Sequence, residues 1–102
     1  MKKVPIGEHR QDFQVVAGTA RSQAAVMILQ PGEETGGPDN RHEDSDQWLY
    51  VVAGEGGAGV GGGTRALEAG GRRGVEAGEG HEVRGRGEEP LVTVNVYAPP
   101  AY

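Results

Sequence analysis

Hydrophobic and polar residues alternate with a period of two near the end of the chain. From Leu91 to Tyr97 a valine occupies every second position, and Thr93 and Asn95 stand between the valines. This spacing is typical of a β-strand whose two faces meet different surroundings. The same alternation in Gln47–Ala53 places Gln47, Leu49 and Val51 on one strand face, with Trp48, Tyr50 and Val52 on the other.

Other short apolar segments are separated by Gly, Pro or Asn, and they predict further strands. No window of helical length carries an apolar stripe, because glycine interrupts each candidate. The sequence therefore predicts an all-β sandwich or barrel. Its strands are expected at Phe13–Val16, Ala24–Leu29, Gln47–Ala53, Ala58–Val60, Thr64–Leu67, Arg73–Glu76, His81–Arg84 and residues 91–97.

Glycine supplies 19 of the 102 residues, well above the usual level of about 7%. Many of these glycines lie between Gly54 and Gly87, interleaved with single apolar residues, as expected where tight turns join short strands. The run from Gly54 to Gly63 could also be a linker, but each half beside it is too small to build its own core. We therefore expect one domain, residues 1–102, with a glycine-rich hairpin inside it. A phosphate-binding loop is excluded because no helix follows the run.

Charge and composition exclude several function classes. The formal net charge is −5, which argues against nucleic acid or an anionic membrane as a partner. The chain has no cysteine, so any metal must be held by imidazole, carboxylate or amide groups. Neither an export signal nor a membrane-spanning segment is evident, and a cytoplasmic location is the expectation.

Two of the three histidines lie beside predicted strands. His42 precedes the Gln47–Ala53 strand in a polar turn, and His81 follows a Gly-Glu-Gly turn. His9 lies in a polar N-terminal segment and is expected to be an exposed histidine without a role. His42 and His81 are therefore the candidate metal ligands.

The spacing around these histidines resembles the two motifs of the cupin superfamily. In the first motif, residues about 32–54, Asn40 and His42 stand at the two histidine positions, and Gln47 stands at the glutamate position six residues before Gly54. In the second, residues about 70–85, His81 stands at the histidine position. The segments Asp-Gln-Trp (46–48) and Tyr-Ala-Pro-Pro (97–100) are similar to a cupin 2 subset often labelled mannose-6-phosphate isomerase-like. The resemblance implies a double-stranded β-helix (jelly-roll) barrel.

The resemblance also implies a metal site in the barrel, with His42, Gln47 and His81 as ligands. The chain departs from the family pattern at Asn40, Gln47, Glu76 (for proline) and Gly85 (for asparagine). The candidate cofactors are divalent transition metals, namely the imidazole-preferring ions zinc, nickel, copper and iron, and also manganese, with Asn40 as an additional candidate oxygen ligand. Loss of the glutamate charge predicts weaker metal binding and a preference for an anionic ligand. The alternative is a metal-free polar cluster that holds water.

Two functions therefore remain open from the sequence. The first is a barrel that binds a metal and a small polar or anionic molecule, with isomerase- or dioxygenase-type chemistry as one option. The second is a metal-free ligand-binding or sensory barrel. Candidate pocket residues are Leu49, Val51, Glu76 and Tyr97. Trp48 and Tyr50 on the outer strand face predict either a homodimer or packing under the N-terminal strands.

Overall fold

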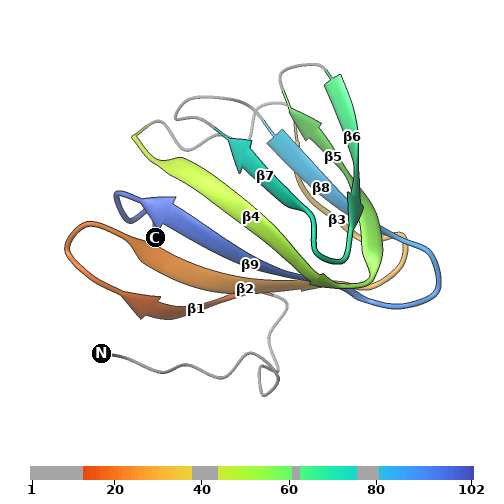
Figure 1. Ribbon diagram of the computed structural model, residues 1–102, viewed down its shortest axis with the longest axis horizontal. Helices are drawn as coiled ribbons and strands as arrows, with labels where there is room; N and C mark the ends of the chain where they lie inside the picture. The colour runs from red at the N-terminus through yellow and green to blue at the C-terminus, as the bar shows by residue number, and fades with distance from the viewer. Residues whose placement is uncertain (1–12, 38–43, 61–62, 76–80) are drawn as a thin grey trace.

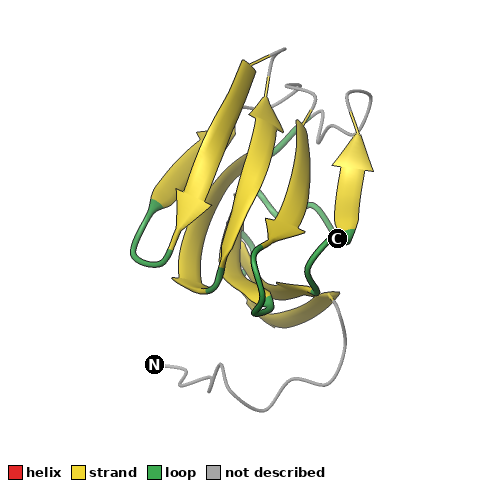
Figure 2. Cartoon of the chain, turned by 90° about the vertical axis from the view of Figure 1, so that its right-hand side faces the viewer, coloured by secondary structure: helices red, strands yellow, loops and turns green. Residues whose placement is uncertain are grey.

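The computed structural model describes residues 13–37, 44–60, 63–75 and 81–102, without the side chains of residues 35–37, 60, 75 and 81. Within these ranges every regular element is a strand (Figure 2), and no helix is present that could span a membrane. The strands are β1 (Phe13–Gly18), β2 (Gln23–Leu29), β3 (Glu34–Gly37), β4 (Asp46–Ala53), β5 (Glu55–Val60), β6 (Gly63–Glu68), β7 (Arg72–Val75), β8 (His81–Arg86) and β9 (Leu91–Ala98).

The strands form two antiparallel sheets that face one another (Figure 1). The first sheet has the order β1-β2-β9-β4-β7, and the second has the order β3-β8-β5-β6. Apart from the consecutive pairs β1–β2 and β5–β6, neighbouring strands are distant in sequence, because β9 returns between β2 and β4 while β8 returns between β3 and β5. This arrangement confirms the predicted all-β sandwich.

Each predicted strand is present, with ends that differ by a few residues. The glycine-rich run forms the β5–β6 hairpin, in which Val60 pairs with Gly63, as the sequence predicts. Strand β3 was not predicted, because its residues Glu-Thr-Gly-Gly have little β propensity. Its backbone pairs with β8, and the Arg84 guanidinium forms an ion pair with Glu34 across this pair of strands. Pairing with β8 therefore stabilises a strand that the β propensity of its own residues does not favour.

The core lies between the two sheets. In β4, Gln47, Leu49 and Val51 are buried, whereas Trp48 and Tyr50 on the opposite face are exposed. This confirms the two faces predicted from alternation. Both sheets contribute to one apolar cluster, with Phe13 packed against it. The cluster contains Met27, Leu29, Leu49, Val51, Ala58, Leu67, Val83 and Leu91.

The valines of β9 face outward. Leu91, Thr93, Asn95 and Tyr97 are buried, while the valines between them are half-buried or exposed. Beside them on the outer face of the first sheet lies Trp48, which is 62% exposed. The outer face of this sheet is therefore unusually apolar for a surface.

The two ends of the sandwich differ. At the Gln47 end, β4 begins and β9 ends; at the Gly54 end, β4 ends and β9 begins. Gly54 has a positive φ of 79°, and a Cβ placed there would lie 2.2 Å from the Pro90 carbonyl oxygen. The chain can make this close approach only with glycine at position 54.

Candidate functional site

Gln47 is a polar side chain in the apolar interior. It lies at the start of β4, between Tyr97 of β9 and Val75 of β7 in the register of the first sheet. Alternation turns it to the same face as Leu49 and Val51, and only 4% of the residue is exposed. Burial of an amide is unfavourable unless its polar atoms find partners.

A chain of hydrogen bonds orients this amide. The Gln47 Nε2 group donates to Asn95 Oδ1 at 2.9 Å, and Asn95 Nδ2 donates to Thr93 Oγ1 at 3.0 Å. Asn95 and Thr93 are both fully buried. Gln47 Oε1 is buried as well, but it has no hydrogen-bond partner within the described part of the protein. The amide thus presents an unsatisfied acceptor inside the sandwich.

The other predicted ligands can be located only in part. His42, Asn40 and Glu76 lie outside the described residues. His81 begins β8, where its backbone pairs with Gly37 of β3 and Val60 of β5, and nothing is described of its side chain. Among the described side chains, no group of three His, Asp or Glu is suited to hold a metal ion.

The predicted pocket residues Leu49, Val51 and Tyr97 lie on the same inner face as Gln47. Leu49 and Val51 belong to the apolar cluster. Next to them at the Gln47 end, Gln23 donates from Nε2 to the carbonyl oxygen of Tyr102 at 2.7 Å, and its Oε1 accepts from the Tyr102 backbone N–H at 2.9 Å. The C-terminal residues are therefore fixed across this end of the first sheet.

Tyr97 is the buried phenol of this region. Its ring meets the Tyr102 ring edge-on, with centroids 5.2 Å apart. Burial raises the pKa of Tyr97 far above its ordinary value of 10, and interaction with Tyr102 raises it further. The phenol therefore remains neutral throughout the physiological pH range.

This raised pKa predicts a loss of stability in alkali. Unfolding exposes a phenol that ionises near pH 10, whereas the folded phenol keeps its proton at that pH. The stabilising effect is fully present below pH 10, and above it the free energy of unfolding should fall by up to about 1.4 kcal/mol per pH unit. Tyr97→Phe should flatten this slope in urea unfolding measured from pH 8 to 11. Equal slopes in Tyr97→Phe and the parent would contradict the prediction, and Tyr50→Phe, an exposed tyrosine, is the control.

Asn95 and Thr93 were missed as site residues in the sequence analysis. Alternation places them on one face with Leu91 and Tyr97, but it does not say which face of β9 is turned inward. Hydrophobicity would favour the valine face. One signal could have pointed to Asn95. A buried Gln47 needs a polar neighbour on an adjacent strand, and Asn95 carries a second amide that can pair with it.

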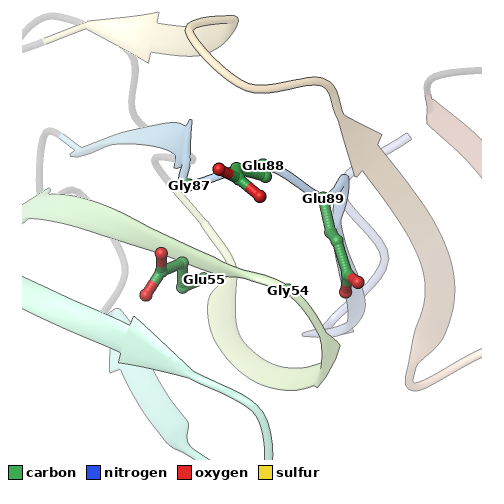
Figure 3. Close-up of a pocket in the computed structure, with 5 residues that line it drawn as sticks. All are labelled: Gly54, Glu55, Gly87, Glu88 and Glu89. Atoms are coloured by element: carbon green, nitrogen blue, oxygen red, sulfur yellow. The ribbon is translucent and has the colours of Figure 1, made fainter.

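A separate hollow lies at the Gly54 end. It has a volume of about 630 Å³ and is lined by Gly54, Glu55, Gly87, Glu88 and Glu89. Figure 3 shows the carboxylates of Glu55 and Glu89 pointing to opposite sides rather than toward a common point. This arrangement does not converge on a cation.

Comparisons with known proteins agree on one family. The family model described as "Cupin domain" matches residues 25–97. The solved structure of BH2720 from Bacillus halodurans is 27% identical, with a TM-score of 0.87 over 93% of this chain and 75% of that chain.

Two other solved structures are similar over almost all of this chain. A Klebsiella pneumoniae protein described as an uncharacterized conserved protein with a double-stranded beta-helix domain is 27% identical, with a TM-score of 0.80 over 97% of this chain and 86% of that one. KdgF from Halomonas sp. is 24% identical, with a TM-score of 0.83 over 97% and 95%, respectively, and supports the fold alone. The search of the curated proteins gave no match.

Proposed function

Because this chain belongs to the cupin family and has its double-stranded β-helix fold, we propose that it binds a divalent transition metal and a small polar or anionic molecule inside the barrel. The proposed metal ligands are His42, Gln47 and His81, with Asn40 as a further candidate. The narrower mannose-6-phosphate isomerase-like label and a cytoplasmic location stay predictions.

The observation that supports this proposal is the unsatisfied Oε1 of Gln47. A buried amide oxygen without a donor costs about 1–3 kcal/mol, so a partner is expected there in the working protein. Asn95 accepts the hydrogen bond from Nε2 of the same amide, and Oε1 is buried without a donor among the described residues. An amide oxygen is a neutral ligand for a divalent ion, and it fits the predicted imidazole partners.

The described side chains around Gln47 support a role in ligand binding. A bound divalent ion would polarise an oxygen of the ligand as a Lewis acid. The protein's own contribution is to orient Gln47 through Asn95 and to exclude water with Leu49 and Val51. The buried polar residues of the described part are Gln23, Ser45, Gln47, Thr93 and Asn95. None of these is a carboxylate or imidazole that could serve as a general base.

Substitutions at Gln47 test the metal site. Gln47→Leu should remove the oxygen ligand and lower metal affinity, whereas Gln47→Glu should restore a charge and raise the affinity on the order of tenfold, a common effect size at metal sites. The measurement is metal content by plasma mass spectrometry after dialysis against zinc, nickel, copper, iron(II) or manganese. Gln30→Leu makes the same chemical change at an exposed position and is the control.

Two results would contradict the metal proposal. One is that the parent protein and Gln47→Glu both take up no ion. The other is that Gln47→Leu binds metal as tightly as Gln30→Leu. The first result would support the alternative, a metal-free ligand-binding barrel in which Gln47 Oε1 accepts a hydrogen bond from water or ligand. The second would remove Gln47 from the set of metal ligands.

We also propose that the protein forms a homodimer through the outer face of the first sheet. Trp48, Tyr50, Val52 and Val96 expose large apolar side chains on this face. Trp48 and Val96 are direct neighbours across the β4–β9 pair, so these side chains form a continuous patch. Patches of this kind commonly mark contacts between proteins.

A further inference from the structure

Two arginines occupy inner-face positions on the edge strands of the two sheets. Arg65 of β6 is directly opposite Ala58 of β5, and Arg73 of β7 is directly opposite Leu49 of β4. Ala58 and Leu49 both belong to the buried cluster. Because directly paired residues of antiparallel strands share a face, both arginines are placed on the face of their sheet that carries the core residues, and at these edge strands both are solvent-exposed.

The two arginines line one pocket. Strands β6 and β7 are the last strands of their sheets. A pocket between residues of β5, β6 and β7 has a volume of about 240 Å³ and is lined by Ala58, Gly63, Arg65, Arg73 and Gly74. Two of its five lining residues are glycines, so a ligand can approach the backbone closely.

Backbone carbonyl groups hold both guanidinium groups in place. Arg73 donates from Nη2 to the carbonyl oxygen of Ala66 at 3.2 Å, which carries its guanidinium from β7 across to β6. Arg65 donates from Nη1 to the carbonyl oxygen of Thr64 at 3.0 Å. Within the described ranges, the ion pair that forms is Arg84–Glu34, and neither pocket arginine takes part in it. Both positive charges therefore line one pocket, and neither forms an ion pair within the part of the chain that the structure describes.

Such a pair of guanidinium groups is suited to an anion. Each group can present parallel N–H donors to two oxygens of a carboxylate or phosphate. The net charge of the chain is −5, so the positive charge here is a local feature. The pocket is smaller than the about 300–1,000 Å³ usual for drug-sized ligands, so it suits one anionic group with few attached atoms.

The pocket lies close to Gln47 along the β4–β7 pair of the first sheet. Gln47 pairs with Val75, two residues after Arg73 on the same strand and face. Diagonal neighbours in antiparallel sheets lie about 7–8 Å apart. We propose that Arg65 and Arg73 bind the carboxylate or phosphate group of a small organic anion whose remainder extends toward Gln47. This inference rests on the proposed function and identifies the class of its ligand.

Titration of the labelled full-length protein with anions tests this inference. Amide NMR signals of Gly63 and Gly74 are followed while malonate or inorganic phosphate replaces chloride at constant ionic strength. Saturable shifts are expected, and the probe that binds more tightly distinguishes a carboxylate from a phosphate site. Arg65→Gln and Arg73→Gln should each weaken binding by about tenfold, the usual size for a charged hydrogen bond. Arg72→Gln, a neighbour opposite the exposed Tyr50, is the matched control and should change little.

Two outcomes would overturn the inference. Shifts that stay linear with both probes would mean that no site exists. Shifts unaffected by Arg65→Gln and Arg73→Gln would place binding elsewhere, and the arginines would then serve only to block pairing of the edge strands with another sheet.

The arginine proposal and the metal proposal can be tested independently, because different substitutions remove the two sites. Gln47→Leu should keep the saturable anion shifts, and Arg65→Gln/Arg73→Gln should keep the metal content of the parent. If metal loads but no anion binds, the arginine inference is wrong while the proposed metal site stands. If anions bind but no metal loads, the reverse holds.

Discussion

Gly54→Ala should leave little folded protein, whereas Gly70→Ala should cost only about 1–2 kcal/mol, the usual penalty of the left-handed conformation for a residue with a Cβ. Both glycines have a positive φ, 79° for Gly54 and 87° for Gly70. A Cβ at Gly70 meets nothing within 4 Å. A Cβ at Gly54 lies 2.2 Å from the Pro90 carbonyl oxygen and 2.9 Å from the Leu91 Cα atom.

The strand that follows Pro90 cannot move aside cheaply. Leu91 is fully buried in the apolar cluster, so a backbone shift there would disturb the core. We expect Gly54→Ala to destabilise by more than about 4 kcal/mol, which is exceptional for one substitution and a large part of the stability of a typical domain. Urea unfolding followed by circular dichroism measures both variants. Equal losses at Gly54 and Gly70 would show that the Pro90 contact relaxes, and the prediction would be wrong.

Asn95→Leu should produce the second large loss of stability. The substitution removes the acceptor for Gln47 Nε2 and the donor to Thr93 Oγ1, both inside the core. Each of the two buried polar groups left without a partner costs about 1–3 kcal/mol, so a total of roughly 2–6 kcal/mol is expected. The measurement is chemical unfolding in the presence of a chelator, so that bound metal does not contribute.

Replacing the whole polar chain should reverse this loss. Exchanging all partners for apolar groups of similar shape is commonly neutral or stabilising. The triple variant Gln47→Leu/Asn95→Leu/Thr93→Val should therefore be at least as stable as the parent protein in chelator. This result would mean that the protein keeps its buried amides for binding. If the triple variant is as unstable as Asn95→Leu, the polar chain instead stabilises the fold. The main reason for proposing Gln47 as a metal ligand would then be lost.

More of the fold than of the candidate site could be predicted from the sequence. Alternation in Gln47–Ala53 gives the strand and its two faces, and the match of Gln47 to a ligand position of the resembled motif indicates which face turns inward. Strand β3 escaped prediction since Glu34–Gly37 becomes a strand only by pairing with β8. Local patterns carry no information about partners that lie about fifty residues away in the chain.

The site depends on contacts between strands that are distant in sequence. Gln47 and Asn95 are 48 residues apart, and spacing alone does not reveal that β9 lies beside β4. The arginines at positions 65 and 73 look like ordinary surface charges until the register places them opposite Ala58 and Leu49. Sequence spacing made Gln47 a candidate ligand, but its hydrogen-bond partner Asn95 became evident only from the three-dimensional register.

Trp48 has a practical consequence for spectroscopy. It is the only tryptophan in the chain, and its side chain lies on the outer face of the first sheet, packed over Gly74. Its indole emission should therefore respond weakly to a molecule that enters beside Gln47, on the opposite face of the same strand. A blue shift of that emission as protein concentration rises would instead report that the outer face has become covered.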